Sequence, residues 1–326
     1  KVPAEWANAT TGAEAVKVEA TEYFDNVIAP ILRREGDKLP VSAFTPTGVV
    51  PTGTTKYEKR GIAVLIPKWD ETKCIQCNQC SLVCPHAAIR PVLVKDENMA
   101  SAPASFVTKK ANGKELAGYQ YRMQVYALDC AGCGNCFDVC LAKDKALTMV
   151  PLDSIAEAEV ANLDFAESQP KPNVKLVPNT VKNSQFLQPL FEFSGACPGC
   201  GETPYIKLIT QLFGDRMIVA NATGCSSIYG GSAPTCPYTV NENGHGPAWA
   251  NSLFEDNAEF GYGMNIANDQ RRAKLAETVA KLIAIDYCDE DIKTSGAEWL
   301  DQKDDAAGSK AAAEKLLAAC REGIDV

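Results

Sequence analysis

The sequence predicts an α+β domain followed by a region of α/β character. Two runs of four cysteines, each flanked by short strand-like segments, indicate a duplicated α+β unit between about residues 57 and 150. A stretch with three prolines, 169–179, then interrupts the pattern as a linker does. Beyond it an amphipathic helix at 202–213 precedes a short apolar strand at 217–220, which is an α/β pattern.

Composition excludes several classes of function. The 326 residues suffice for two modest domains and linkers, and the formal net charge of −9 argues against a nucleic-acid partner, which needs a basic surface. No apolar stretch approaches the ~20 residues of a membrane helix, so no membrane partner is expected. Fourteen cysteines indicate a reducing, anaerobic cytoplasm in which thiolates survive as metal ligands.

The first part of the chain, 1–51, is expected to be a connecting segment. It opens on KVPAEWAN, without a start methionine or a signal sequence, which suggests an interior piece of a longer protein. Residues 21–34 predict a helix with Phe24, Val27 and Ile28 in its apolar stripe and a kink or break at Pro30. Residues 45–55, rich in Pro, Gly and Thr, read as a linker.

The two cysteine runs share one spacing, C-x2-C-x2-C-x3-C, typical of bacterial proteins that bind two [4Fe–4S] clusters. The runs are Cys74, Cys77, Cys80 and Cys84, and Cys130, Cys133, Cys136 and Cys140. In that pattern each run's fourth cysteine ligates the other cluster, so we expect Cys140 to join the first three cysteines and Cys84 to join the second set. Disulfide bonds and a zinc site are weaker alternatives for these eight cysteines. Disulfides suit short secreted chains, and zinc favours two separated Cys-x2-Cys pairs.

Strand-like segments accompany the runs and complete a two-[4Fe–4S] ferredoxin-like domain, residues 52–170. They lie at 63–67 and 147–151, and a polar hairpin candidate at 109–113 precedes a third at 118–128. The α/β region then begins at 171. Its helix 202–213 is predicted to carry an apolar stripe and to stop at Gly214, and helices at 269–282 and 309–321 follow.

A third set of cysteines lies in this α/β region. Cys197 and Cys200, in ACPGCGE, open the predicted helix, and Cys225, in NATGCSS, follows the predicted strand. Three thiolates near a helix N-terminus can hold another cluster, because backbone N–H groups favour its negative charge. On spacing alone, a zinc site or a redox-active Cys-x2-Cys pair fits nearly as well.

A family resemblance gives a more specific interpretation of this region. The stretch from FSGACPGCGE through NATGCSS to FGYGM resembles the opening of the thiamine diphosphate domain of pyruvate:ferredoxin (flavodoxin) oxidoreductases, and the preceding double cysteine unit resembles their ferredoxin domain. The resemblance implies that residues 171–326 are the incomplete N-terminal part of an α/β thiamine diphosphate-binding domain. It also implies that Cys197, Cys200 and Cys225 ligate a third [4Fe–4S] cluster, with Glu202 and Cys225 lining the thiamine pocket.

Other parts of the family pattern are missing between Lys1 and Val326. They are the fourth ligand of the third cluster, the GDG-type motif for Mg²⁺ and diphosphate, and the substrate-binding threonine and arginine. No catalytic residue is therefore assigned within this segment, and alone it is expected to be inactive.

The function implied by the resemblance is oxidative decarboxylation of pyruvate to acetyl-CoA and CO2, with coenzyme A as co-substrate. Electrons would pass through three [4Fe–4S] clusters to ferredoxin or flavodoxin, and the expected partners are the rest of the same enzyme and a second copy in a homodimer. The alternatives are a stand-alone iron–sulfur electron-transfer protein and an oxidoreductase for another 2-oxoacid. His86 follows a cluster cysteine, where a hydrogen bond could tune the cluster, but a surface position is expected. His245 is expected in a loop that is not assigned to the site.

Overall fold

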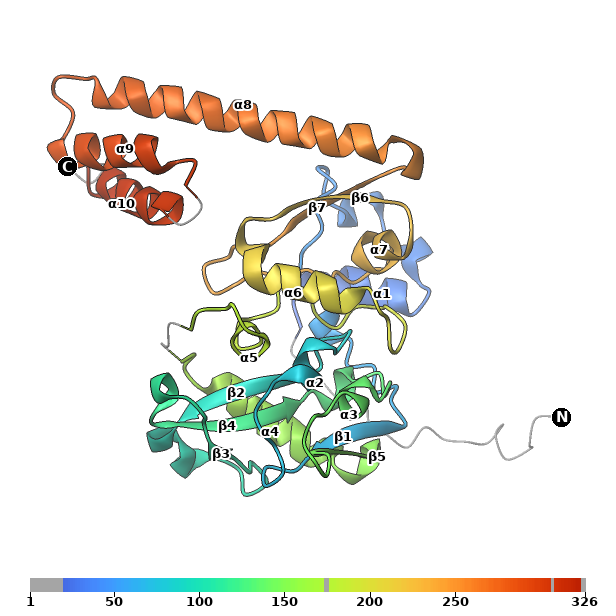
Figure 1. The fold of residues 1–326 in the computed structure, drawn as a ribbon. Coiled ribbons are helices and arrows are strands. Elements are labelled where there is room, and N and C mark those ends of the chain that lie inside the picture. Colours follow the sequence, from blue (N-terminus) through green and yellow to red (C-terminus); the bar gives the residue numbers. More distant parts are fainter. Residues whose placement is uncertain (1–19, 173–175, 306–307, 324–326) are drawn as a thin grey trace. The chain divides into compact units, whose positions relative to one another are not determined.

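The structure is a computed structural model that describes residues 20–172, 176–305 and 308–323 (Figure 1). The chain divides into two compact units, Lys1–Asn251 and Ser252–Val326. The described α-helices are α1 (Ala29–Leu32), α2 (Gln79–Leu82), α3 (Asn135–Asp138), α4 (Ala156–Ser168), α5 (Val181–Ser184), α6 (Thr203–Phe213), α7 (Cys225–Ser227), α8 (Asn257–Ile283), α9 (Glu290–Gln302) and α10 (Gly308–Glu322). The strands are β1 (Leu65–Trp69), β2 (Ile89–Lys95), β3 (Lys109–Lys110), β4 (Tyr119–Val125), β5 (Leu147–Pro151), β6 (Ile218–Ala222) and β7 (Ala248–Ser252).

Two antiparallel sheets form the mixed α+β core of the first unit (Figure 1). One has the strand order β2-β4-β3, and the other pairs β1 with β5. The buried side chains between them include Trp69, Tyr121 and Met123. The predicted hairpin and the strands at 118–128 and 147–151 are confirmed, whereas the strand predicted at 63–67 begins two positions later, at Leu65.

Helix α4 covers the three-stranded sheet, and the sequence did not reveal it. Its Phe165 packs edge-on against Phe106, with ring centroids 4.7 Å apart, and its Glu159 forms a buried ion pair of 2.7 Å with Arg122 on β4. The few buried residues of α4 do not fall on one continuous apolar stripe, so no helical periodicity stands out in the sequence.

The N-terminal helix is confirmed, and it continues past Pro30. A π-turn at Phe24–Ile28 buries Phe24, Val27 and Ile28, and α1 continues to Leu32. Pro30 lies inside a run that is helical without a break from residue 22 to residue 32, and the helix changes from π to α geometry just before it instead of ending there.

The third cysteine set lies in the segment after Leu190. Phe191, Tyr229 and Tyr238 form a buried aromatic cluster, and β6 pairs with β7. Helix α6 begins and ends as predicted, but its apolar stripe is not its buried face. Tyr205 is 71% exposed, whereas Lys207 is 2% exposed, because α6 turns its polar side toward the cysteine-bearing core.

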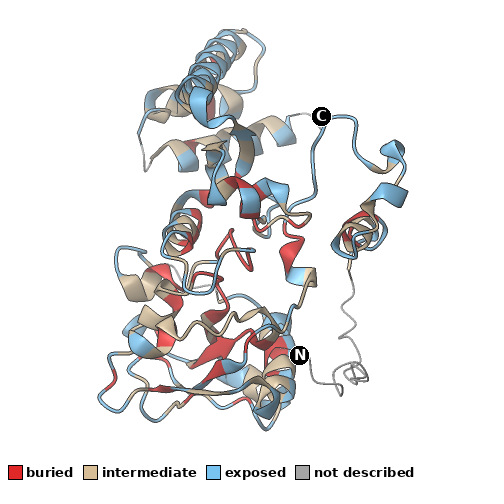
Figure 2. Ribbon diagram, turned by 90° about the vertical axis from the view of Figure 1, so that its right-hand side faces the viewer, coloured by how far each residue is buried: buried red, intermediate tan, exposed pale blue. Residues whose placement is uncertain are grey.

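The second unit is a three-helix arrangement of α8, α9 and α10. The helices predicted at 269–282 and 309–321 correspond to the end of α8 and to α10, while α9 was not predicted. Figure 2 shows that buried residues gather in the strands and loops of the first unit, whereas α8 is almost wholly exposed. Within the described ranges, no helix combines the length and apolar character needed to cross a membrane. The domain boundaries after residues 51 and 170 remain predictions.

Candidate metal centre

The eight cysteines of the two runs line two separate cavities in the first unit. Cavity A is bordered by Cys74, Cys77, Cys80 and Cys140, and cavity B by Cys84, Cys130, Cys133 and Cys136. Each cavity thus takes three cysteines from one run and the last cysteine of the other. The remaining walls are largely apolar, with Trp69, Met123 and Leu147 at cavity A and Ile89 and Met149 at cavity B.

The loops around the two cavities repeat the same backbone geometry. In each loop two positions between successive cysteines and one after the last cysteine adopt a left-handed conformation, which bends the chain around the cavity. The paired positions with positive φ are Gln76 (58°) with Gly132 (69°), Asn78 (60°) with Gly134 (81°), and Ala87 (53°) with Lys145 (47°). The short helices α2 and α3 follow at equivalent positions.

Backbone N–H groups point at the cysteine sulfurs in the same repeated way. The donor–sulfur distances are 3.4 Å for Gln76 to Cys74 and Gly132 to Cys130, and 3.3 Å for Ala88 to Cys84 and Ala146 to Cys140. Such bonds stabilise negative charge on sulfur and are one of the ways in which a protein sets the potential of a cluster.

The cavities are poor places for unpaired thiolates. Burial raises the pKa of Cys80 far above its ordinary value, and the neighbouring thiols of Cys74 and Cys77 raise it further. Burial likewise raises the pKa of Cys130 to about 12, with Cys84 adding to the effect. Four thiolates in such a cavity therefore require a bound cation, which iron supplies in a cluster.

The chemistry of the donor set separates a cluster from a single ion. Among the described residues, no group of three or more Cys, His, Asp or Glu is placed to share one metal ion. A cubane holds its four thiolates at its corners, farther apart than one ion would, so four cysteines around one cavity fit a cluster better than zinc.

The turn that carries Cys197 and Cys200 lies against cavity B. The N–H of Cys200 donates to the carbonyl of Cys197 over 3.1 Å, and Gly199, with φ of +76°, closes the turn. A Cβ atom on Gly199 would lie 3.8 Å from the Cβ of Cys133 and 3.8 Å from the side chain of Asn135. The third cysteine set therefore begins in contact with the loop of the second run.

His86 joins the same two regions, and its predicted surface position is wrong. It is 4% exposed, lines cavity B, and its Nε2 donates to the carbonyl of Ala196 over 2.8 Å. Because a carbonyl only accepts, Nε2 carries the proton. Burial lowers the pKa of His86, which keeps the ring neutral. Its position two residues after Cys84 pointed to the cluster, but burial depends on Ala196, which lies 110 residues later in the chain.

Comparisons with known proteins agree with this geometry. A family model described as a 4Fe–4S double cluster binding domain matches residues 73–143, and a domain of unknown function named EKR matches residues 10–63. Pyruvate:ferredoxin oxidoreductase of Moorella thermoacetica is 61% identical over 98% of this chain and 27% of its own length. The pyruvate-flavodoxin oxidoreductase of Klebsiella pneumoniae is 47% identical over 99% of this chain and 28% of its own.

The chain is homologous to a segment of pyruvate:ferredoxin (flavodoxin) oxidoreductase. It spans about a quarter of the length of these curated relatives. The double-cluster domain accounts for cavities A and B, whose cysteines all lie between residues 74 and 140.

The region that the EKR model matches is tied to the metal centre by one ion pair and two hydrogen bonds to backbone carbonyls. Lys59 forms an ion pair of 2.6 Å with Asp129, the residue before Cys130. Arg60 donates to the carbonyls of Phe193 and Ser194 over 2.8 and 3.0 Å, a few residues before Cys197. Two neighbouring side chains thus hold the second cysteine run and the third cysteine set to one segment.

The other predicted site residues lie near the start of α6 and of α7. Glu202 immediately precedes α6, and its carboxylate raises the pKa of the buried Tyr229 beyond what burial alone does, although the two make no regular hydrogen bond. Cys225 begins α7 and is exposed, as is Cys197. Cys225 is thus positioned by a different segment from the Cys197–Cys200 turn.

Four buried polar atoms between residues 194 and 249 have no hydrogen-bond partner. They are the hydroxyls of Ser194, Thr203 and Tyr229 and the indole N–H of Trp249. Buried polar groups are normally hydrogen-bonded, so atoms of this kind suit a polar cofactor that brings its own donors and acceptors. The described residues here fit one side of such a cofactor.

Lys207 is a charged residue that sequence reasoning missed. Its Nζ donates to the carbonyls of Ser81 and Leu82, at 3.1 Å for Leu82, and burial lowers its pKa to about 8. The helix stripe gave no signal, because a lysine among apolar residues is normally placed in solvent.

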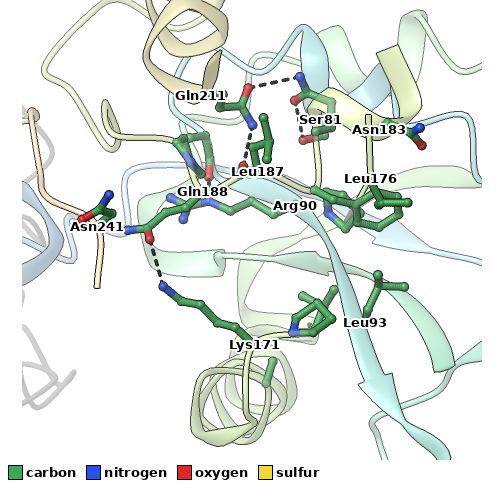
Figure 3. A pocket seen from close by; sticks show the side chains of 18 of the residues that line it. Ser81, Arg90, Leu93, Lys171, Leu176, Asn183, Leu187, Gln188, Gln211 and Asn241 are labelled. Atoms are coloured by element: carbon green, nitrogen blue, oxygen red, sulfur yellow. Dashed lines mark hydrogen bonds between the residues drawn. The ribbon is translucent and has the colours of Figure 1, made fainter. Parts of the chain in front are cut away.

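Lys207 also borders a cavity of about 470 Å³ next to α2 (Figure 3). Polar side chains there form a linear chain of hydrogen bonds, from Ser81 to Gln185, from Gln185 to Gln211 and from Gln211 to the carbonyl of Leu187. Because these groups already have partners, we assign no ligand to this cavity.

Proposed function

We propose that the chain is the electron-relay segment of an enzyme that oxidatively decarboxylates pyruvate to acetyl-CoA and CO2 and delivers the electrons to ferredoxin or flavodoxin. The observation that carries the proposal is the pairing of cavities A and B, each bordered by four thiols from two distant cysteine runs. The choice of pyruvate and of the acceptors follows the names of the relatives.

The cysteines would hold three [4Fe–4S] clusters, which store and transfer single electrons. The first is held by the four cysteines of cavity A and the second by the four of cavity B. For the third, Cys197, Cys200 and Cys225 supply three thiolates, and the fourth ligand comes from outside this segment. Cys197 and Cys225 are exposed residues, which suits a site that another part of the enzyme completes.

Thiamine diphosphate with Mg²⁺ is the proposed organic cofactor, in an α/β domain that begins near residue 171. When bound, it supplies the electron sink for loss of CO2, and coenzyme A accepts the acyl group. Glu202 and Cys225 would border it, and the Thr203 hydroxyl is available to hydrogen-bond it. Ligands for Mg²⁺ would come from outside the described residues.

The order of the clusters follows from the contacts of the Cys197–Cys200 turn. The approach of Gly199 to Cys133 and the bond from His86 to Ala196 both favour cavity B as the nearer neighbour of the third cysteine set. We therefore place the cluster of cavity B in the middle of the relay and that of cavity A at the exit. Short spacing between neighbouring sites keeps the path inside the protein and away from water.

Anaerobic purification of the complete oxidoreductase that carries this segment tests the proposal. We expect three [4Fe–4S] signals by electron paramagnetic resonance, and reduction of ferredoxin or flavodoxin on addition of pyruvate, coenzyme A and thiamine diphosphate. Cys84→Ser should remove the iron of one cluster and abolish acceptor reduction. Cys288 lies in the second unit, and Cys288→Ser should leave both the iron content and the reduction of the acceptor unchanged. Normal acceptor reduction by the iron-depleted Cys84→Ser enzyme would refute the relay.

A further inference from the structure

The position of Lys207 is unusual because its ammonium group has no charge partner. The side chain extends from α6, is 2% exposed, and bonds only to the backbone carbonyls of Ser81 and Leu82. No carboxylate in the described part of the chain forms an ion pair with it. Removing an ammonium from water without a counter-charge is costly, and carbonyl dipoles compensate only part of that cost.

Two other cations of the same unit, Arg90, which is half-buried, and Arg122, which is buried, each have a carboxylate partner. Arg90 pairs with Glu192 at 2.5 Å, and Arg122 pairs with Glu159 at 2.7 Å. Lys207 therefore stands out among its neighbours, and the missing negative charge must come from a group that the protein binds.

The carbonyls that hold Lys207 show where that charge lies. Ser81 and Leu82 belong to α2, between Cys80 of cavity A and Cys84 of cavity B. A [4Fe–4S] cluster with four thiolates is an anion, and its negative charge increases on reduction. Lys207 is thus placed between two sites that would each supply the counter-charge it lacks.

We infer that Lys207 is a positioning residue whose fixed positive charge raises the reduction potentials of the clusters in cavities A and B. The inference rests on the proposed function, because it requires both clusters to be present. A nearby cation stabilises the reduced cluster more than the oxidised one, so it makes each cluster easier to reduce. The same helix carries the Cys197–Cys200 turn at its start, so α6 links the third cysteine set to this charge.

The test is a redox titration of the complete enzyme followed by electron paramagnetic resonance. Lys207→Met removes the charge and keeps most of the volume. We expect the ratio of reduced to oxidised cluster in cavities A and B at a fixed potential to fall about tenfold, a shift of ~59 mV toward negative values for a one-electron couple. Lys207→Arg retains the charge and should stay close to the wild type.

Lys145→Met is the matched control for charge. Lys145 also donates to backbone carbonyls beside a cavity, those of Asp138 and Cys140 at 2.8 and 3.0 Å, but it is only half-buried. Solvent screens its charge, so its removal should shift the potentials much less than removal of Lys207. Equal shifts for the two variants, or none for Lys207→Met, would overturn the inference.

Iron content separates this inference from the proposed function. Wild-type enzyme without iron would contradict the relay itself, whereas normal iron with unchanged potentials contradicts only the role of Lys207. If Lys207→Met loses iron, the redox titration is made on Lys207→Gln instead, because glutamine keeps a hydrogen-bond donor for one of the two carbonyls. A wild-type potential in Lys207→Gln would then count against the charge and in favour of a purely structural role.

Discussion

Gly132 offers a sharp test of the loop geometry around cavity B. It has φ of +69°, and a Cβ atom there would lie 2.9 Å from the carbonyl oxygen of Leu65 and 3.1 Å from the Cβ of Ala63. Gly134, two residues later, has φ of +81° with open space around its Cβ position. Alanine at either position meets the same backbone strain, but only Gly132→Ala also meets a clash with β1.

The difference between the two variants isolates the clash. Left-handed backbone costs about 1–2 kcal/mol for a residue with a Cβ, and this cost is common to both. The clash adds about 1–3 kcal/mol, because the strand carbonyl must move. Since each 1.4 kcal/mol is about tenfold, cluster binding should be roughly 5- to 150-fold weaker in Gly132→Ala than in Gly134→Ala.

Chelator competition under anaerobic conditions measures this difference. The iron of one cluster should be lost from Gly132→Ala at a much lower chelator concentration than from Gly134→Ala, while the cavity A cluster keeps its spectrum. Gln76 occupies the equivalent left-handed position of the first loop and shows that a side chain is tolerated where space allows. Its side-chain amide donates to the carbonyl of Lys110 and accepts from the N–H of Asn112. Equal chelator midpoints for the two variants would refute the loop geometry.

Two further predictions concern the junction with the third cysteine set. Glu202→Gln should weaken thiamine diphosphate binding or slow pyruvate-dependent cluster reduction, with the iron of cavities A and B unchanged; normal kinetics would leave Glu202 with only a helix-dipole role of about 0.3–1 kcal/mol. His86→Phe removes the bond to Ala196 and should slow electron transfer into the cavity B cluster in a single turnover. A wild-type transfer rate in an iron-replete His86→Phe enzyme would show that this bond is not needed.

Local patterns made part of this molecule predictable. The cysteine spacing indicated which sulfurs share a cavity, because two runs of identical spacing are typical of a unit in which each run's fourth cysteine serves the other cluster. Strand β5 and helix α6 were likewise found within one residue of their ends, since period and stop signals are local. The cofactor edge near Glu202 depended on a family resemblance rather than on any pattern in the residues.

Long-range contacts defeated the sequence reasoning. His86 was expected at the surface and nothing in the sequence singled out Lys207, yet both are buried because segments more than 100 residues apart supply their partners. Ala196 lies 110 positions from His86, and Ser81 lies 126 from Lys207. Periodicity assumes that a helix buries its apolar stripe, and α6 instead buries Thr203, Lys207 and Thr210. A polar face of this kind is favoured only where the surface opposite it offers carbonyls or charge.

The same long-range contacts explain how an electron path can be held rigid without a large apolar interface. Lys59 and Arg60 fix the second run and the third cysteine set to one short segment, and Lys207 fixes α6 to the α2 helix between the cavities. Each of these bonds involves a charged donor, and such bonds are about twice as strong as neutral ones. Apolar packing tolerates small displacements, whereas directed bonds to specific carbonyls fix distance and orientation together. Electron transfer between fixed sites depends on both, and polar contacts accordingly join the Cys197–Cys200 turn and α6 to the two cysteine runs.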